Sequence, residues 1–436
     1  MKAEIAMKYN RRIFPYYKGM GWDPLFYSAI IFLFLTEVKG IEPTKVIYAE
    51  SVYSLFLLLL QIPSAILVEK IGSRKALILG TTFATIQIGI MIFVNNFWYL
   101  VIAYFMSAFG NALKDIARNT LLYDSTKMCK GKNSFGNINA KGSSLSNALS
   151  AITSVVAGYL FVINPYIPIV LSTFISLLAI IIAYRFEEVE IETKEKTTVS
   201  QSMKDIKQGF IFILKSNRLK ALFLFTSIFV GVLMMISTYE KSLLTDLKVA
   251  PQYFGIIFAI LTLVQSFSIN YQDKIHNTFK NRTLAFISIP IFISFIIVGV
   301  ITKLNFNFAF TLIIVIIAFF IHHIFRGPYW VLEDRYVTNF TNSNIRAKIL
   351  SASNLIKNIG EIVISFLGGL LLEFYTTSTA YLIVGIVGLI IILLVLRYMK
   401  TRIGLNPEEY NEKDITFNKL GEWYLAIFYY NSLIKI

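Results

Sequence analysis

The sequence predicts an all-α membrane protein with twelve transmembrane helices in two six-helix bundles. Of the 436 residues, 56% are apolar and only 15% are charged, whereas a soluble domain carries about 25% charged residues. The apolar residues form long blocks between short polar loops, and a helix needs about 20 mainly apolar residues to cross a bilayer. Because only a helix satisfies its own backbone groups within one segment in lipid, each block is predicted to be a helix.

Twelve blocks are long enough to span. They cover residues 13–36, 44–68, 74–94, 97–122, 138–162, 165–185, 218–239, 252–272, 283–302, 305–327, 346–372 and 377–398. These blocks divide the chain into a first bundle (1–186), a linker (187–217), a second bundle (218–400) and a polar tail with an aromatic end (401–436). Met203, Phe210 and Leu214 recur at helical spacing in the linker, which predicts an amphipathic helix on the membrane surface.

Lysine and arginine are concentrated in alternate loops, which places those loops in the cytoplasm. The basic loops include those around Arg11, Arg74, Lys130, Lys280 and Arg346. Both termini are then cytoplasmic, and we expect a multi-pass protein of the cytoplasmic membrane. The net charge of +15 is explained by this topology, so we exclude a nucleic-acid partner, whose binding would need one soluble basic face.

Neither a cofactor nor a metal is predicted. Cys129 is the single cysteine, which excludes an internal disulfide and a thiolate cluster. Adjacent histidines on a helix, such as His322 and His323, point about 100° apart, so they do not form a metal pair. Residues 136–143 have the wrong order for a phosphate-binding loop. We therefore do not expect an enzyme.

The two halves show a weak repeat with an offset of about 205–210 residues. Four pairs of similar residues occur in the same order, namely Glu69 with Asp273, Arg118 with Arg326, Asp124 with Asp334, and Ser143 with Ser351. Parallel six-span repeats with a site near the midplane are a transporter architecture.

The loop after the second span reads Ala65-Ile-Leu-Val-Glu69-Lys-Ile-Gly72-Ser-Arg74-Lys75. It resembles the signature loop of the major facilitator superfamily, although Ala65, Glu69 and Ser73 depart from the usual residues. Residues 119–125 are similar to bacterial multidrug-efflux-like members, and residues 346–351 are similar to the superfamily's entry to span eleven. The resemblance covers residues of about 10–400 and implies two six-helix bundles.

In that family the signature loop is implied to latch one state of alternating access. The positions that would do so here are Glu69, Gly72, Arg74, Asp124 and Asp273. The plainer alternative is a charged loop that only fixes topology. Gly72 has a local role in either case, because glycine permits a tight reversal between helices.

Asp23 lies deep in the first span, where Gly19, Gly21 and Pro24 predict a broken or kinked helix. Burial favours the neutral form of a carboxyl, so Asp23 is our first candidate for proton coupling. The alternative is an acid that pairs with Lys18 or Lys114 and does no transport work.

Other ionisable residues lie within predicted spans, where a charge costs at least ~2.5 kcal/mol. One face of span four carries Asn111, Lys114, Asp115 and Arg118, which we expect either to line a substrate cavity or to form a structural ion-pair cluster. Asp115 and His322 are further proton candidates. The remaining candidates for substrate contact are Gln61, Gln265, Arg326, Lys357 and Glu361, the last two as an i,i+4 pair. Glu50 and Glu240 are expected to be solvated near the outer ends.

These features predict a monomeric secondary transporter that moves a small-molecule substrate across the lipid bilayer, coupled to protons, with efflux of drug-like or amphipathic compounds suggested by the resemblance. Two alternatives stay open: a sensor or assembly partner on the same scaffold, and a membrane-embedded lipid-modifying enzyme.

Overall fold

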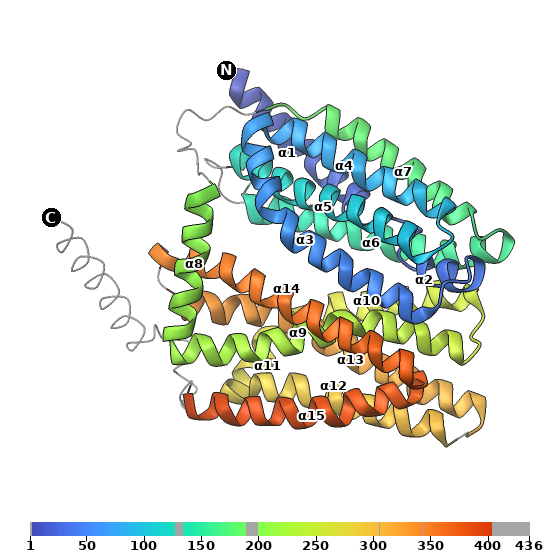
Figure 1. Ribbon diagram of the computed structural model, residues 1–436. Coiled ribbons are helices and arrows are strands. Elements are labelled where there is room, and N and C mark those ends of the chain that lie inside the picture. The colour runs from blue at the N-terminus through green and yellow to red at the C-terminus, as the bar shows by residue number, and fades with distance from the viewer. Residues whose placement is uncertain (1, 127–133, 189–198, 305, 342, 403–436) are drawn as a thin grey trace. The chain divides into compact units, whose positions relative to one another are not determined.

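The computed structural model describes residues 2–126, 134–188, 199–304, 306–341 and 343–402, and these residues form helices without any strand (Figure 1). Eleven of the described helical segments are long and apolar enough to cross a membrane. The predicted all-α membrane fold is therefore confirmed. The aromatic end of the tail lies outside the described residues.

The helices of the first half follow the predicted spans closely, with the first span as the exception. They are α1 (Lys2–Gly21), α2 (Ile31–Leu33), the π-helical η1 (Phe34–Val38), α3 (Pro43–Ile71), α4 (Ser73–Ile90), the 3₁₀ turn η2 (Met91–Phe93), α5 (Phe97–Thr126), α6 (Phe135–Ile163) and α7 (Ile167–Tyr184).

The second half begins with the predicted linker helix and continues with six long helical segments. They are α8 (Val199–Lys215), α9 (Asn217–Asp246), α10 (Pro251–Ser268), η4 (Ile269–Tyr271), α11 (Gln272–Phe279), η5 (Lys280–Arg282), α12 (Thr283–Lys303), α13 (Phe308–Asn339), α14 (Ser343–Phe374) and α15 (Thr377–Arg402). The existence of α8 confirms the helix predicted in the linker, whereas its place on a membrane surface stays a prediction.

The chain forms two compact units. The first comprises Met1–Val199, Ser237–Leu263 and Ser365–Glu373, and the second comprises Ser200–Ile236, Val264–Ile364 and Phe374–Ile436. Each unit takes residues from both halves of the sequence, so the division into bundles at 1–186 and 218–400 stays a prediction.

The first predicted span is broken, as its glycines and proline suggest. Helix α1 ends at Gly21, and residues 22–30 form bends and turns before α2 begins. Pro24 has no N–H to donate, and Phe26 adopts a left-handed φ of 65°, which interrupts a right-handed helix. This break leaves backbone carbonyls at the end of α1 without partners in their own helix.

Helices α4 and α5 cross at close range because two glycines face each other. A Cβ atom on Gly80 would lie 2.7 Å from the carbonyl oxygen of Gly110 and 2.8 Å from the backbone nitrogen of Lys114. A Cβ atom on Gly110 would lie 2.7 Å from the carbonyl oxygen of Gly80. The crossing therefore fixes the height and rotation of α5, which carries the charged face predicted from the sequence.

Packing partners repeat between the two halves. Helix α4 packs against α5 and α7, and α12 packs against α13 and α15. The first residues of α4 and α12, Ser73 and Thr283, are 210 residues apart, as are Ile167 and Thr377 at the starts of α7 and α15. These offsets agree with the weak repeat in the sequence.

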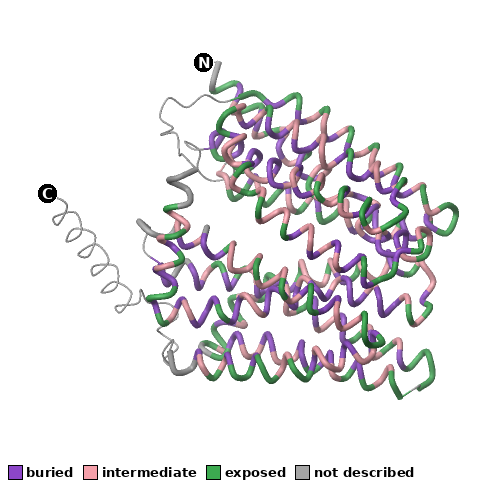
Figure 2. Tube along the Cα trace, viewed as in Figure 1, coloured by how far each residue is buried: buried purple, intermediate pink, exposed green. Residues whose placement is uncertain are grey.

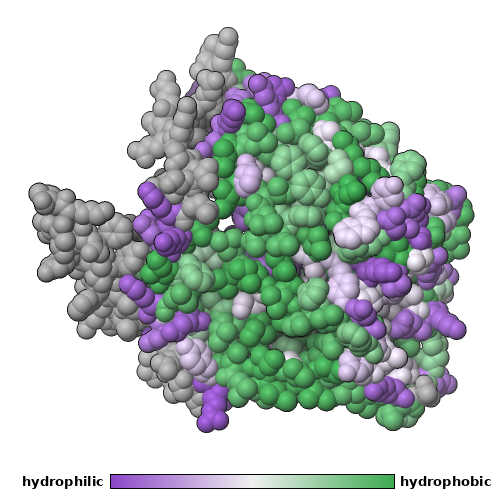
Figure 3. All heavy atoms as spheres, viewed as in Figure 1, coloured by the Kyte–Doolittle hydropathy of each residue, from purple (hydrophilic) through white to green (hydrophobic). Residues whose placement is uncertain are grey.

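The sides of the helices carry exposed apolar residues, as a lipid environment requires. Buried and exposed residues alternate along each helix (Figure 2), and Leu59, Ile152 and Leu394 are each more than 60% exposed. On the face drawn in Figure 3, apolar residues cover the helices and hydrophilic residues gather towards their ends. Exposed apolar surface of this extent is a liability in water and is accommodated in a bilayer.

Candidate functional site

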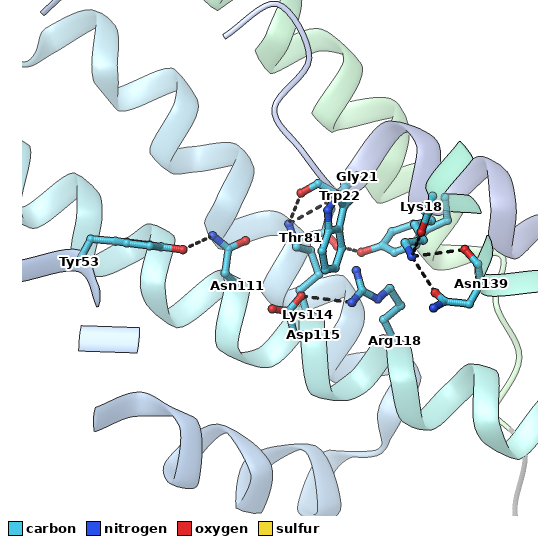
Figure 4. Close-up of polar contacts among 12 residues, drawn as sticks. Lys18, Gly21, Trp22, Tyr53, Thr81, Asn111, Lys114, Asp115, Arg118 and Asn139 are labelled. Carbon is cyan, nitrogen blue, oxygen red and sulfur yellow. Dashed lines mark hydrogen bonds and ion pairs between the residues drawn. The ribbon is translucent and has the colours of Figure 1, made fainter. Parts of the chain in front are cut away.

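The charged face of α5 meets the broken end of α1 inside the first unit (Figure 4). Lys114 is only 5% exposed, and its Nζ donates hydrogen bonds to the carbonyls of Gly21 (2.9 Å) and Trp22 (3.3 Å). These carbonyls lie at the negative end of the α1 dipole, where a cation is favoured. Lys114 therefore stabilises the break that the sequence predicts.

Arg118 lies one turn further along α5 and is 4% exposed. Its guanidinium stacks on the Trp22 ring, with Cζ 3.7 Å from the ring centroid, and its Nη2 lies 3.6 Å from Asp115 Oδ1. Arg118 Nε and Nη1 are buried and have no hydrogen-bond partner in the described part of the chain. Buried donors without an acceptor are costly, so these two nitrogens of Arg118 call for an explanation.

Lys18 is the third buried cation, and sequence reasoning gave it only a supporting role. Its Nζ donates to Asn139 Oδ1 (2.7 Å) and Ser143 Oγ (2.6 Å) of α6. Gly142 leaves room for its stem, because a Cβ there would lie 2.9 Å from Lys18 Cδ. Lys18 therefore joins α1 to α6.

Asp23 is half-buried within the break and interacts electrostatically with Lys114, Arg118, Asp115 and Lys18. We call Lys18, Asp23, Lys114, Asp115 and Arg118 the charge cluster. It contains three bases and two acids, which leaves one surplus positive charge. The three bases of the cluster are buried, whereas the Asp115 side chain is 46% exposed.

A row of polar and aromatic groups continues along α5 from the charge cluster. Asn111 Nδ2 donates to Tyr53 OH of α3 at 3.0 Å, and the ring of Tyr53 lies 5.8 Å from that of Tyr104. Gln61, also on α3, is exposed. Tyr53, Tyr104 and Trp22 are thus aromatic members of the site that sequence reasoning did not single out, because aromatic residues are abundant throughout the chain.

In the second unit, an ion pair joins α13 to α14. Lys357 Nζ lies 3.2 Å from Glu333 Oε2, Glu333 is 1% exposed, and Glu333 Oε1 has no hydrogen-bond partner among the described residues. Glu361 is half-buried one turn along α14. Sequence reasoning missed Glu333, whose signal was its position seven residues after Arg326 on the same helical face.

The other candidates of the second unit lie in different surroundings. His322 is fully buried, with Nε2 2.9 Å from Ser294 Oγ and its ring 4.9 Å from that of Phe295. Arg326 Nη2 is 3.9 Å from Met234 Sδ, and Gln265 is half-buried on α10.

Two of the predicted latch residues, Gly72 and Arg74, lie where α3 meets α4. Gly72, with a φ of 89°, makes the tight reversal between α3 and α4. Glu188 accepts hydrogen bonds from the backbone N–H groups of Ser73 (2.8 Å) and Arg74 (2.6 Å). The carboxylate of Glu188, which follows α7, therefore caps the start of α4.

The other three predicted latch residues are Glu69, Asp124 and Asp273. Glu69 is exposed and Asp124 is buried near the end of α5. In the second unit, Asp273 of α11 pairs with Arg335 of α13 at 3.0 Å. The roles of these residues in a latch stay predictions.

The expectation that Glu240 is solvated was wrong. Glu240 is 0% exposed, because the end of α9 packs inside the first unit. There Lys241 Nζ donates to the carbonyl of Ser28 at 3.1 Å, and Thr238 donates to Glu50 Oε2 at 2.7 Å. Glu50 is half-buried.

Comparison with known proteins identifies the family. The family model described as Major Facilitator Superfamily matches residues 24–316 and 304–433. The chain therefore belongs to the Major Facilitator Superfamily, and its fold is that of a multi-pass membrane transporter. No curated protein matches the chain.

Solved structures of transporters share the fold at low sequence identity. The chain is similar to the nucleoside transporter NupG, with a TM-score of 0.70 and 11% identity over 92% of this chain and 100% of that one. A bacterial homolog of the human lysosomal transporter Spinster has a TM-score of 0.66 and 13% identity, over 91% of this chain and 98% of that one. A POT family transporter in complex with 5-aminolevulinic acid has a TM-score of 0.62 and 13% identity, over 92% of this chain and 96% of that one.

Proposed function

We propose that the chain is a secondary active transporter that moves a small solute across the cytoplasmic membrane by alternating access. The observation that carries this proposal is the charge cluster. A charge within a span costs at least ~2.5 kcal/mol on insertion scales, so five ionisable groups gathered at the break in the first span are expensive to retain. A pathway for a solute and an ion would explain why these ionisable groups are kept, whereas the helical fold alone does not need them.

Proton coupling is the second part of the proposal, and Asp23 is its main residue. Asp23 interacts with both Lys114 and Arg118, so its protonation would remove a negative charge next to two buried bases. The cluster would then attract an anion or repel a cation more strongly, which links proton uptake to solute affinity. Asp115 is the second candidate because its half-exposed side chain faces Arg118.

His322 is the weaker proton candidate of the second unit. Its ring is enclosed by Phe295 and Phe319 and bonded to Ser294, an arrangement that also suits a purely structural histidine. Glu333 is a better candidate there, because it is a carboxyl with one buried oxygen that has no partner among the described residues.

We propose drug-like or amphipathic solutes as cargo, and efflux by proton antiport for a cationic solute, which protonated Asp23 would repel. An anionic solute, which protonated Asp23 would attract, would instead move in the same direction as the proton. Efflux is supported by the resemblance of residues 119–125 to multidrug-efflux-like members. The solved relatives support the transporter fold, and the solutes in their names belong to those proteins. Cytoplasmic termini are supported by the basic loops.

The test is solute flux in proteoliposomes with an imposed pH gradient. The purified protein is reconstituted, and a panel of labelled anionic, neutral and cationic solutes is measured with and without the gradient. We expect gradient-dependent flux of at least one solute, and its loss in Asp23→Asn. Glu42→Gln is the matched control, because Glu42 forms an exposed pair with Lys45. Gradient-independent behaviour across the panel would refute the proposal.

The two rival functions make different predictions. A sensor or assembly partner on this scaffold would show no flux but would co-purify with a defined protein partner. A lipid-modifying enzyme would change the lipid composition of the vesicles in which it is reconstituted. Lipid analysis of the same proteoliposomes therefore separates the rivals in the flux experiment.

A further inference from the structure

We propose that Arg118 and Trp22 form a binding subsite for a small organic anion, a carboxylate or sulfonate carried on an apolar body. This inference deepens the proposed function, on which it rests, by naming the substrate class. It is argued from the hydrogen-bonding capacity of the charge cluster, from its charge balance and from the groups that continue along α5.

The first argument is that Arg118, unlike the other two buried bases, has buried nitrogens without any hydrogen-bond partner in the described part of the chain. Lys18 donates to Asn139 and Ser143, and Lys114 donates to the carbonyls of residues 21 and 22. Arg118 keeps two buried nitrogens, Nε and Nη1, without a partner among the described residues. Guanidinium hydrogen bonds to carboxylates are charge-assisted and stronger than neutral ones.

The second argument is that the acid beside Arg118 does not satisfy it. The Nη2–Oδ1 distance of 3.6 Å to Asp115 exceeds that of a hydrogen bond. The Asp115 side chain is also 46% exposed, so a ligand can reach this edge of the cluster. With three bases and two acids, an arriving monoanion would neutralise the cluster.

The third argument concerns the apolar part of the ligand. Trp22 covers one face of the guanidinium and is itself 37% exposed, so an apolar body can contact its ring. Asn111 lies seven residues before Arg118 on the same face of α5, about 10 Å away along the axis, and it is bonded to Tyr53. An anion held at Arg118 would therefore extend its apolar body towards Asn111 and Tyr53.

A neutral or cationic solute fits this arrangement less well. It would leave Arg118 Nε and Nη1 without acceptors, and a cation would face a surplus positive charge at short range. The same chemistry accepts a carboxylate or a sulfonate, so the two are tested side by side.

The experiment uses Trp22 as the reporter. In the full chain with Trp98, Trp330 and Trp423 changed to Phe, Trp22 is the remaining tryptophan. Its fluorescence is titrated with iodide, an anionic quencher, and with acrylamide, a neutral one. We expect iodide quenching to contain a saturable component, because bound iodide would sit next to the ring. Benzoate and benzenesulfonate should abolish that component, whereas benzamide should not.

Arg118→Gln should raise the apparent dissociation constant for iodide or benzoate on the order of 10–100-fold, the range expected for losing a charged hydrogen bond. Arg185→Gln, which changes an exposed arginine at the end of α7, should leave it unchanged. Arg118→Lys keeps the charge and should give an intermediate value. Unchanged acrylamide quenching in each variant shows that the surroundings of Trp22 are intact.

Purely linear iodide quenching in the Trp22 reporter protein, or equal competition by benzamide and benzoate, would overturn the proposal without any variant. Because this is a binding measurement, it fails independently of the proposed function. Gradient-driven flux of a cation with no anion binding would refute the subsite and keep the transporter. Anion binding without flux of any solute would support the subsite and refute the transporter.

Discussion

Removal of the lysine from the Lys357–Glu333 pair should destabilise the protein by an amount that depends on pH. Glu333 is 1% exposed, one of its oxygens is 3.2 Å from Lys357 Nζ, and the other has no hydrogen-bond partner within the described residues. Lys357→Met, which keeps the length and apolar stem of the side chain, would leave a buried carboxylate alone. Breaking a buried pair in this way costs about 3–5 kcal/mol.

Protonation of Glu333 sets an upper limit to this loss. With an ordinary glutamate pKa of about 4.3 in the unfolded chain, neutralising the carboxyl costs about 3.7 kcal/mol at pH 7 and about 1 kcal/mol at pH 5, at 1.36 kcal/mol per pH unit. The loss in Lys357→Met should therefore grow as pH rises. The double variant Glu333→Gln/Lys357→Met should recover most of it at pH 8, because no charge remains to be buried.

The assay is the unfolding midpoint of the purified protein in detergent, measured from pH 5 to pH 8. Lys45→Met, which removes one member of an exposed pair with Glu42, is the control and should change the midpoint by little at any pH. A loss in Lys357→Met that is equal at pH 5 and pH 8, or a double variant no more stable than the single one, would refute the reasoning.

Three further predictions concern the first unit. Gly110→Ala should lower the unfolding midpoint, because the added Cβ would lie 2.7 Å from the backbone of α4, whereas Gly136→Ala, with nothing within 4 Å, should not; equal midpoints would contradict the close crossing. Glu188→Ala should cost about 0.5–2 kcal/mol, as loss of a helix cap does, seen as a lower unfolding midpoint than in Glu187→Ala, whose contacts with Asn10 are made by its backbone. Lys114→Met should reduce solute flux and speed hydrogen exchange of amides in residues 22–30, because the carbonyls of Gly21 and Trp22 lose their shared donor; unchanged exchange there would count against this role of Lys114.

Local features of the fold could be predicted from the sequence because local chemistry determines them. Gly19, Gly21 and Pro24 predict the break in the first span, and α1 ends at Gly21. Gly72 predicts the tight reversal between α3 and α4. The φ of 89° at this residue lies in a region that favours glycine. The shared face of Asn111, Lys114 and Arg118 follows from helical spacing.

Contacts between helices distant in sequence could not be predicted in the same way. Helical periodicity places Lys114 on the polar face of α5. It does not predict that the acceptors of Lys114 are the carbonyls of Gly21 and Trp22, more than 90 residues earlier in the sequence. Glu333 was missed because its burial depends on how α13 packs within the second unit. The burial of Glu240 likewise reflects where α9 ends, which a hydropathy pattern does not specify.

Flux driven by a pH gradient in proteoliposomes, compared between the unchanged protein and Asp23→Asn, tests the central claim most directly. Our account predicts accumulation or release of at least one solute that follows the imposed gradient in the unchanged protein and in Glu42→Gln, and is lost in Asp23→Asn. The same gradient-dependent flux in Asp23→Asn would contradict the role of the broken first span, and absence of any such flux in the unchanged protein would contradict the transporter itself.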